Sequence, residues 1–326
     1  MSDNREKSMQ MHLRHFAKYN RPGMAAVIAV GLLLITVILN PLSLNINTFG
    51  SILAQTILLS FAAAGQTMVV ISGGVDLSVG AVMSMAAIIT TGIMQGRTGY
   101  FVPVLLCVAG MGALVGLVNG VCAVKVGLPP IVITLAVSNV VTRLQYVFTG
   151  GMPTGLVSEV FKVTVQYRVF GVIPAALMYA VFIWTLAFFL MHGSRFGKQL
   201  YLTGNNESAA RLNGINTRRI RILTFVLGGV FSGIAGMLGA GYMGMSQCQL
   251  FDTYAYNSLV AVIVGGSLFV GGVGSYIGSI AGSLVMIVLS NGLTVLDFSA
   301  PVRNIVLGCV MVILLTFYNR AKPIRQ

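Results

Sequence analysis

The chain has 326 residues, of which 56% are hydrophobic and 8% are charged, whereas a soluble globular domain carries about 25% charged residues. The composition therefore excludes a soluble protein and predicts a polytopic membrane protein whose apolar surface faces lipid and neighbouring helices. The net charge of +13 does not indicate a nucleic-acid partner, because many Lys and Arg residues gather in both tails and one internal segment, as in cytoplasmic loops.

Ten apolar runs follow one another along the chain, and each approaches the roughly 17–25 residues that cross a bilayer. They are residues 24–40, 52–71, 77–93, 102–124, 131–148, 172–192, 220–242, 254–270, 276–296 and 302–318. We therefore predict an all-α polytopic membrane protein of about ten transmembrane segments, with eight spans and two re-entrant segments as the alternative. Either count places both tails on the same side of the membrane.

Basic residues set the expected orientation and the division of the chain. Residues 1–21 and 321–326 are predicted to be cytoplasmic tails, and residues 22–320 to form the transmembrane domain. Residues 193–221 are predicted to be a cytoplasmic loop within that domain. The first apolar run is long enough to span, so we expect a multi-pass protein with both termini cytoplasmic and no cleaved signal.

A weak similarity between two segments of the sequence predicts pseudo-repeated halves. Asn119-Gly120 is followed ten residues later by Pro129, and Asn291-Gly292 is followed ten residues later by Pro301. Duplicated halves are common in transporters, where the substrate route runs between them.

A double-glycine break with an acidic residue interrupts the apolar pattern at residues 73–81, GGVDLSVGA. Gly73 and Gly74 can end one helix, and Asp76 is predicted to cap the next helix, with Ser78 nearby. One interpretation is a capped turn at the cytoplasmic surface. The other is a discontinuous element beside a translocation route, since a break at membrane depth must be buried in protein or line water.

Polar residues inside the apolar runs are further candidates for the path of an uncharged polar solute. Those that we single out are Gln66, Thr67, Asn139 and Arg143. Each polar side chain could equally join helices to one another, and the arginine could extend to the outer interface. The histidines and cysteines form no ligand pattern, so no metal site is expected.

Residues 193–221, GSRFGKQLYLTGNNESAARLNGINTRRIR, form a polar and basic segment in an otherwise apolar chain. Asn205 is predicted to cap a short helix, and Glu207 suits the positive N-terminal end of that helix. Gly214 can end it in the left-handed conformation. A membrane protein needs such a segment on one face only where something soluble docks.

The same short helix carries apolar side chains at helical spacing. Ala209, Leu212 and Ile215 predict one small apolar face that could enter the groove of a partner. The residues assigned to this docking element are Asn205, Glu207, Ala209, Ala210, Leu212 and Gly214.

Three motifs, in this order, carry a resemblance to a known family. They are GGVDLSVGA at 73–81, RFGKQLYLTGNNESAARLNGI at 195–215 and VAVIVGGSLFVGGVGS at 260–275. From about Gly23 to Tyr318 the chain resembles the membrane permease of ribose-type sugar ATP-binding-cassette importers. Gln66 and the segment QCQLFDTY at 247–254 depart from the usual pattern of that family.

The resemblance implies a Type II-like importer permease in the bacterial inner membrane, paired with a second permease copy of the same or a different chain. It implies an ATPase subunit on the cytoplasmic face and a periplasmic sugar-binding protein opposite. The helix at 205–214 would couple ATPase motion to the pore. ATP and Mg would be held by the ATPase, and no cofactor is expected in this chain.

The residues themselves agree with a subunit that is powered by a partner. The sequence has no GxxxxGK[ST] phosphate loop, so the chain is not expected to hydrolyse ATP. It also lacks the residues of a rhomboid-like or aspartyl membrane protease, so an enzyme is not expected. The expected function is a permease that passes a small neutral sugar inward. The alternative is a stand-alone secondary transporter or channel for a small polar solute.

Overall fold

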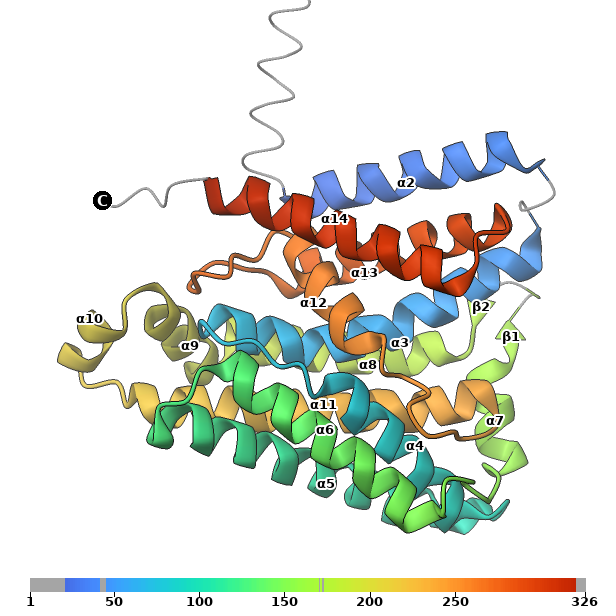
Figure 1. Cartoon of the computed structure of the whole chain (residues 1–326), viewed down its shortest axis with the longest axis horizontal. Helices are drawn as coiled ribbons and strands as arrows, with labels where there is room; N and C mark the ends of the chain where they lie inside the picture. The colour runs from blue at the N-terminus through green and yellow to red at the C-terminus, as the bar shows by residue number, and fades with distance from the viewer. Residues whose placement is uncertain (1–20, 42–44, 170, 172, 321–326) are drawn as a thin grey trace, which may run out of the picture.

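The structure is a computed structural model that describes residues 21–41, 45–169, 171 and 173–320. Residues 1–20 of the predicted tail 1–21, and all of the predicted tail 321–326, lie outside the described residues. In the described part the longer helices lie side by side along one direction, and their arrangement confirms the predicted all-α class (Figure 1).

The helices follow the apolar runs in chain order. The first half holds α2 (Arg21–Leu39), α3 (Ile46–Ile71), α4 (Val79–Met94), η2 (Thr98–Tyr100), α5 (Phe101–Val121), η3 (Cys122–Val126) and α6 (Pro130–Thr149). The middle holds α7 (Glu159–Gln166), β1 (Arg168–Val169), β2 (Ile173–Pro174), α8 (Ala176–Phe188), η4 (Phe189–Gly193), α9 (Arg195–Asn205) and α10 (Glu207–Leu212). The last part holds α11 (Thr217–Met243), α12 (Tyr254–Val264), α13 (Tyr276–Val295) and α14 (Ala300–Arg320).

Six helical segments of the described chain are long and apolar enough to cross a membrane. They contain α3, α5, α6, α8, α11 and α13. Shorter apolar helices within α2, α4, α12 and α14 occupy the other four predicted runs. The positions of the runs are therefore confirmed, whereas the number of complete spans and the repeated halves stay predictions.

The interior is built around α3 and α11, whose backbones approach their neighbours at glycine. A Cβ atom on Gly112 of α5 would overlap the carbonyl group of Gly229 of α11, and the reverse also holds. Small residues allow this approach where lipid removes the hydrophobic drive for helix association. Close packing is thus the role of these two glycines.

Two half-length helices, α4 and α12, each follow a non-helical segment. Residues 72–78 lead into α4 and residues 244–253 lead into α12, and the two segments enter from opposite ends of the bundle (Figure 1). They meet in the interior, where a Cβ on Gly80 would lie 2.6 Å from the carbonyl oxygen of Phe251. The amide of Phe251 also donates to Oγ of Ser84 at 2.9 Å.

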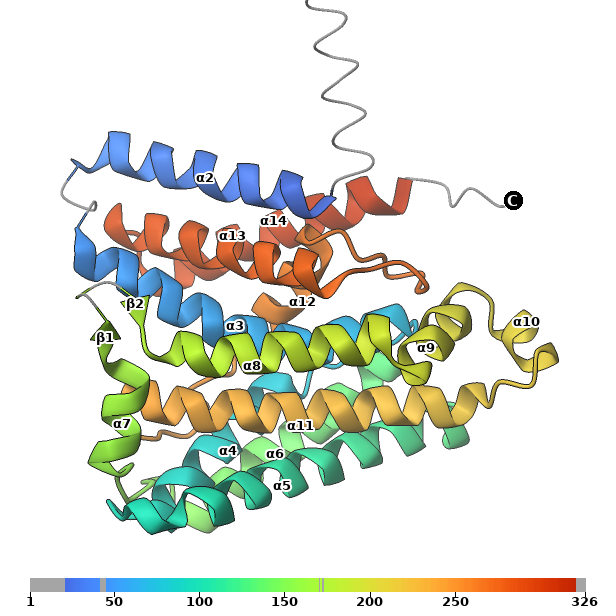
Figure 2. The same cartoon turned by 180° about the vertical axis from the view of Figure 1, so that it is seen from behind.

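The two ends of the bundle carry different elements. Helices α9 and α10 project from one end, and α7 with the antiparallel strands β1 and β2 covers the other (Figure 2). Neither α7 nor the strands were predicted from the sequence. The beginning of α2 and the end of α14 lie toward the α10 end (Figure 1), which agrees with the predicted parity.

Candidate functional site

Helix α9 begins at a side-chain cap and is joined to the loop before α13 by a partly buried hydroxyl group. The side chain of Ser194 accepts a hydrogen bond from the amide of Gly197 at 3.0 Å, as an N-cap does. The hydroxyl of Tyr201 donates to the carbonyl of Gly274 at 2.9 Å. Burial raises the pKa of Tyr201 to about 12, so the hydroxyl keeps its proton and the hydrogen bond at physiological pH.

The last turn of α9 meets two other parts of the chain at a junction of glycines. The amide of Gly272 donates to the carbonyl of Ile71 at 2.9 Å. A Cβ on Gly271 would lie 2.9 Å from the carbonyl oxygen of Gly204 and 3.1 Å from the amide nitrogen of Gly73. The three sequence motifs at 73–81, 195–215 and 260–275 therefore converge here, and we call these five residues the glycine junction.

Helix α10 begins at a different cap from the one predicted. The side chain of Asn206, not that of Asn205, accepts from the amide of Ala209 at 3.0 Å, and Asn205 is the last residue of α9. The prediction for Asn205 was wrong because two adjacent asparagines are equally good caps, and only the extended backbone of Asn206 aims its side chain at the helix. Gly214 has φ of +77°, which confirms the predicted left-handed end.

Charged side chains brace α10 against the start of α11. Glu207 forms ion pairs with Arg211 and Arg221 and accepts a hydrogen bond from Oγ1 of Thr217 at 3.2 Å. Partial burial raises the pKa of Glu207, but the hydrogen bond from Arg211 and the two positive charges outweigh it, so the pKa lies below its ordinary value of 4.5. The carboxylate is therefore charged at neutral pH and holds the helix in place.

The braced helix presents one large apolar side chain to its surroundings. Leu212 is 90% exposed, and Ala209 beside it is also exposed, whereas Ala210 is buried. Ile215 turns inward and packs against the main core, so the predicted face of Ala209, Leu212 and Ile215 is wrong in its last member. The backbone reverses at Gly214, and this reversal sends Ile215 away from the helical direction.

The break at residues 72–78 is buried. Oδ1 of Asp76 accepts hydrogen bonds from the amide of Ser78 at 2.8 Å and from its hydroxyl at 2.6 Å. Nδ2 of Asn119 on α5 donates to the same hydroxyl at 2.9 Å. Asp76 is 2% exposed, so the interpretation as a surface turn is wrong.

The carboxylate also does not cap α4 as predicted. The N-cap residue of α4 is Ser78, whose own side chain makes no capping bond, and Asp76 instead bonds within the turn that precedes it. Gly73 has φ of +80° and follows the end of α3, as expected of a helix-ending glycine. The amide of Gly74 donates back to the carbonyl of Val69 at 2.9 Å. Oγ1 of Thr134 on α6 accepts from the amide of Leu77 at 3.1 Å, and Oγ1 of Thr224 on α11 donates to Oγ of Ser72 at 3.2 Å. The break is therefore held by its own turn and by α5, α6 and α11.

Gln66 and Thr67 lie inside the helix bundle. Oγ1 of Thr67 is 2.7 Å from Oγ of Ser279 on α13, so it joins two helices. Gln66 is 1% exposed, and neither atom of its amide has a hydrogen-bond partner among the described residues. Neither side chain is open to a solute in this conformation.

Asn139 and Arg143 are exposed on α6 and lie one turn apart. The next turn carries Tyr146, whose hydroxyl donates to Oε1 of Gln249 at 2.7 Å. Nε2 of Gln249 in turn donates to Oδ2 of Asp252 at 2.9 Å. We call these five residues the polar row. A charge at the centre of a span costs about 2.5–3.5 kcal/mol on insertion scales, so this face is suited to water or protein rather than lipid.

Comparison with known proteins identifies the family. The model of the permease component of branched-chain amino acid transport systems matches residues 48–315. The chain belongs to this family of membrane permeases. The permease is 30% identical to the ribose import permease protein RbsC of Escherichia coli strain K12, over 94% of this chain and 97% of that protein.

Two further relatives transport related solutes according to their names. The permease is 32% identical to the ribose import permease protein RbsC of Bacillus subtilis strain 168, over 86% of this chain and 88% of that protein. It is 28% identical to the galactose/methyl galactoside import permease protein MglC of Escherichia coli strain K12, over 93% and 95%. These similarities confirm the resemblance to sugar import permeases. No solved structure matches the chain.

The structure divides the predicted path residues of the permease into separate places. Gly73, Gly74, Asp76 and Ser78 share the buried break. Gln66 and Thr67 lie elsewhere in the interior, and Asn139 and Arg143 lie on the exposed face of α6.

Sequence reasoning missed four residues that complete these places. They are Asn119, Tyr146, Gln249 and Asp252. The unusual polarity of the segment QCQLFDTY was the available signal for the last two.

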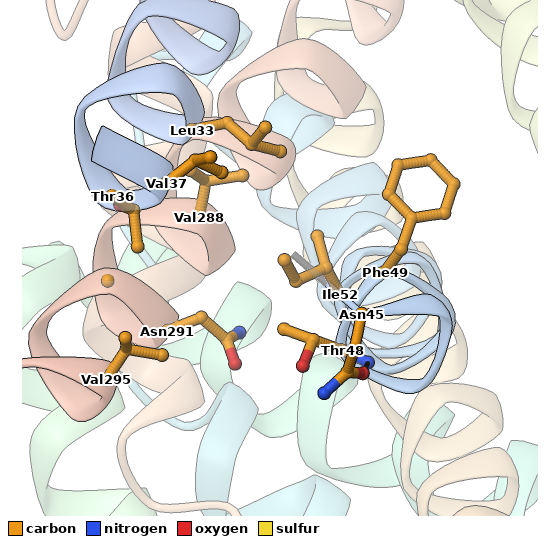
Figure 3. Close-up of a pocket in the computed structure, with 11 residues that line it drawn as sticks. Leu33, Thr36, Val37, Asn45, Thr48, Phe49, Ile52, Val288, Asn291 and Val295 are labelled. Carbon is orange, nitrogen blue, oxygen red and sulfur yellow. Dashed lines mark hydrogen bonds between the residues drawn. The ribbon is translucent and has the colours of Figure 1, made fainter. Parts of the chain in front are cut away.

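A crevice between α2, α3 and α13 is too small for a sugar. The side chains of Thr48 and Asn291 point into it from two sides (Figure 3), and its volume is about 50 Å³. Small-molecule sites measure roughly 300–1,000 Å³. Side chains such as Ile52 and Val288 make its lining mainly apolar, so the crevice is a packing gap rather than a solute site.

Proposed function

We propose that the permease is the membrane subunit of an ATP-driven sugar importer of the bacterial inner membrane. It forms the inward path for a small neutral sugar together with a second permease copy. A cytoplasmic ATPase subunit supplies the energy and holds ATP and Mg, and a periplasmic sugar-binding protein delivers the solute. The ribose and galactose names of the relatives support the substrate class.

The observation that carries this proposal is Leu212, an apolar side chain that is 90% exposed on a braced polar helix. Leaving a leucine in water forgoes roughly 1.5–3 kcal/mol of burial. The ion pairs of Glu207 fix the helix that presents it. An apolar group held out from a rigid support is the arrangement that fits a groove on a soluble partner.

The glycine junction gives the motion of α10 a route into the bundle. Gly204 lies in the last turn of α9, two residues before the cap of α10. Gly204 meets Ile71 and Gly272 backbone to backbone. No side chain lies between these segments to absorb a displacement. A push on α10 therefore moves the ends of α3 and of the loop that precedes α13, and the break at 72–78 follows.

The polar row is the surface that we assign to the sugar. Amide, hydroxyl and carboxylate groups of Asn139, Tyr146, Gln249 and Asp252 offer both donors and acceptors to sugar hydroxyls. An exposed row on one protomer becomes a lined path when a second copy faces it. Gln249 and Tyr146 already bond to one another, so the row is partly ordered before a solute arrives.

Exchange of Leu212→Asp tests the docking role. The side chain is exposed, so the variant should fold and insert normally but lose the apolar contact. We expect at least a tenfold fall in the ATPase subunit that co-purifies with the permease, and loss of sugar uptake. The matched control is Met152→Asp, because Met152 is 80% exposed in the loop after α6. Equal amounts of ATPase with both variants would remove the basis of the proposal.

A further inference from the structure

A basic cavity lies at the α10 end of the bundle. It is bounded by α10, the first turns of α11 and the turn that joins η3 to α6, and its volume is about 400 Å³. Arg211, Arg218 and Arg221 form its charged wall, and Leu128 and Pro129 belong to its apolar wall. This volume falls within the roughly 300–1,000 Å³ of small-molecule sites.

The charges of the cavity are not balanced. Glu207 is the one acidic residue that lines it, against three arginines. Glu207 pairs with Arg211 and Arg221, while Arg218 forms no ion pair in the described part of the chain. Nε of Arg221 is buried and has no acceptor among the described residues. An anion with several acceptor oxygens would satisfy this donor and the excess charge together.

The apolar wall of the cavity continues onto a surface suited to lipid. Val126, Ile131 and Val132, next to the η3–α6 turn, are 64%, 50% and 57% exposed. The ligand that matches this surface therefore combines a phosphate group with hydrocarbon. A carboxylate of the ATPase subunit fits less well. Leu212, the side chain that we assign to that subunit, does not line the cavity, whereas Glu207 and Arg211 do. The cavity and the docking side chain thus use different faces of α10.

We infer that the cavity binds the phosphate group of an anionic phospholipid, with its acyl chains against the exposed apolar residues of the η3–α6 turn, about two helical turns before the polar row begins at Asn139. Basic pockets between membrane helices on the cytoplasmic side are known to hold such headgroups. Arg218 supplies the unpaired charge, and Arg221 supplies the buried donor. Only the naming of the leaflet as cytoplasmic rests on the proposed function, since headgroup binding does not require the ATPase.

Native mass spectrometry of the full-length permease in detergent tests this site. Phosphatidylglycerol and phosphatidylcholine are titrated separately, and we expect tighter binding of phosphatidylglycerol. Arg218→Gln should weaken phosphatidylglycerol binding about fivefold, which corresponds to about 1 kcal/mol for one basic residue near anionic lipid. Arg219→Gln is the matched control, because Arg219 is exposed beside Arg218 and does not line the cavity. Arg218→Lys should restore most of the affinity, since it keeps the charge.

Four results would overturn the inference. The first is equal phosphatidylglycerol binding by the Arg218→Gln and Arg219→Gln variants, and the second is equal binding of both lipids by the unaltered chain. The third is displacement of the lipid by millimolar inorganic phosphate, which would identify a soluble anion as the ligand. The fourth is release of the lipid when the ATPase subunit is added, which would assign the cavity to that partner.

Discussion

The half-length helices α4 and α12 begin in the same interior region, but their first turns are built differently. The acid before α4, Asp76, is 2% exposed and accepts two hydrogen bonds from Ser78. The acid before α12, Asp252, is half-buried and receives one side-chain hydrogen bond, from Gln249. The hydrogen bonds at the first break are the more extensive of the two sets, which suits a structural pivot. Oδ1 of Asp252 is buried and has no hydrogen-bond partner among the described residues, so it is left as an acceptor for a solute. We therefore assign the break before α4 to the conformational change that opens the permease, and the segment before α12 to the path of the sugar.

A substitution at the contact between the two breaks should have the largest effect on uptake and stability. A methyl group added by Gly80→Ala would lie within 2.6–2.7 Å of the carbonyl oxygens of Phe251 and Asp252. Overpacking of this kind costs about 1–3 kcal/mol, and we expect lost uptake and a lower thermal midpoint. Gly92→Ala on the same helix meets nothing within 4 Å and should keep both. Similar uptake and midpoints for the two variants would contradict the contact.

The next largest effect should be the loss of stability when Asp76 is removed, which should distinguish this acid from Asp252. Asp76→Ala removes the acceptor of two buried donors of Ser78, and unsatisfied groups of this kind cost about 1–3 kcal/mol. Thermal unfolding in detergent should therefore show a clear decrease in midpoint. An unchanged midpoint would mean that the first break is not held by this network.

Asp252→Ala should instead reduce transport with little change in stability. The side chain accepts one hydrogen bond from Gln249, so its removal should cost less than about 1 kcal/mol. We expect sugar uptake to fall several-fold, while the thermal midpoint and the amount of bound ATPase subunit stay the same. A large loss of stability with normal uptake per folded molecule would reverse the assignment of the two breaks.

The smallest effect concerns pH at the brace of α10, which lies outside both breaks. The pKa of Glu207 is lower in the folded chain than its ordinary 4.5, so its contribution to stability is present above pH 4.5 and is lost as the pH falls through the folded pKa. The group is partly exposed, so the contribution is about 1 kcal/mol at most. The thermal midpoint should fall less on acidification in the Glu207→Gln variant than in the unaltered chain. Parallel pH profiles of the two proteins would contradict this role of Glu207.

Much of the fold could be predicted from the sequence, because apolar runs that end at polar or glycine residues report local structure. The left-handed conformation of Gly214 followed from its position after a short helical pattern. The region of α7, β1 and β2 was missed because it carries no long apolar run. The cap of α10 was misplaced by one residue, since Asn205 and Asn206 are chemically identical and only the backbone distinguishes them.

The candidate site was less predictable because it depends on contacts between distant residues. The burial of Asp76 depends on a neighbourhood that includes Asn119, which bonds to Ser78 from 41 residues away. The bond from Tyr146 to Gln249 joins residues 103 apart. The convergence of three motifs at the glycine junction is also invisible in the sequence, where they look like independent signatures. Local sequence patterns thus located the individual motifs, but not the distant residues that each motif contacts.

Transport by purified components is the most direct test of the central claim that a partner drives this permease through Leu212. Proteoliposomes should accumulate sugar against a gradient only when the ATPase subunit, ATP and the loaded binding protein accompany the unaltered permease. The Leu212→Asp chain should give no accumulation under the same conditions. Uphill accumulation by the permease alone, or equal accumulation by the Leu212→Asp chain, would contradict the account.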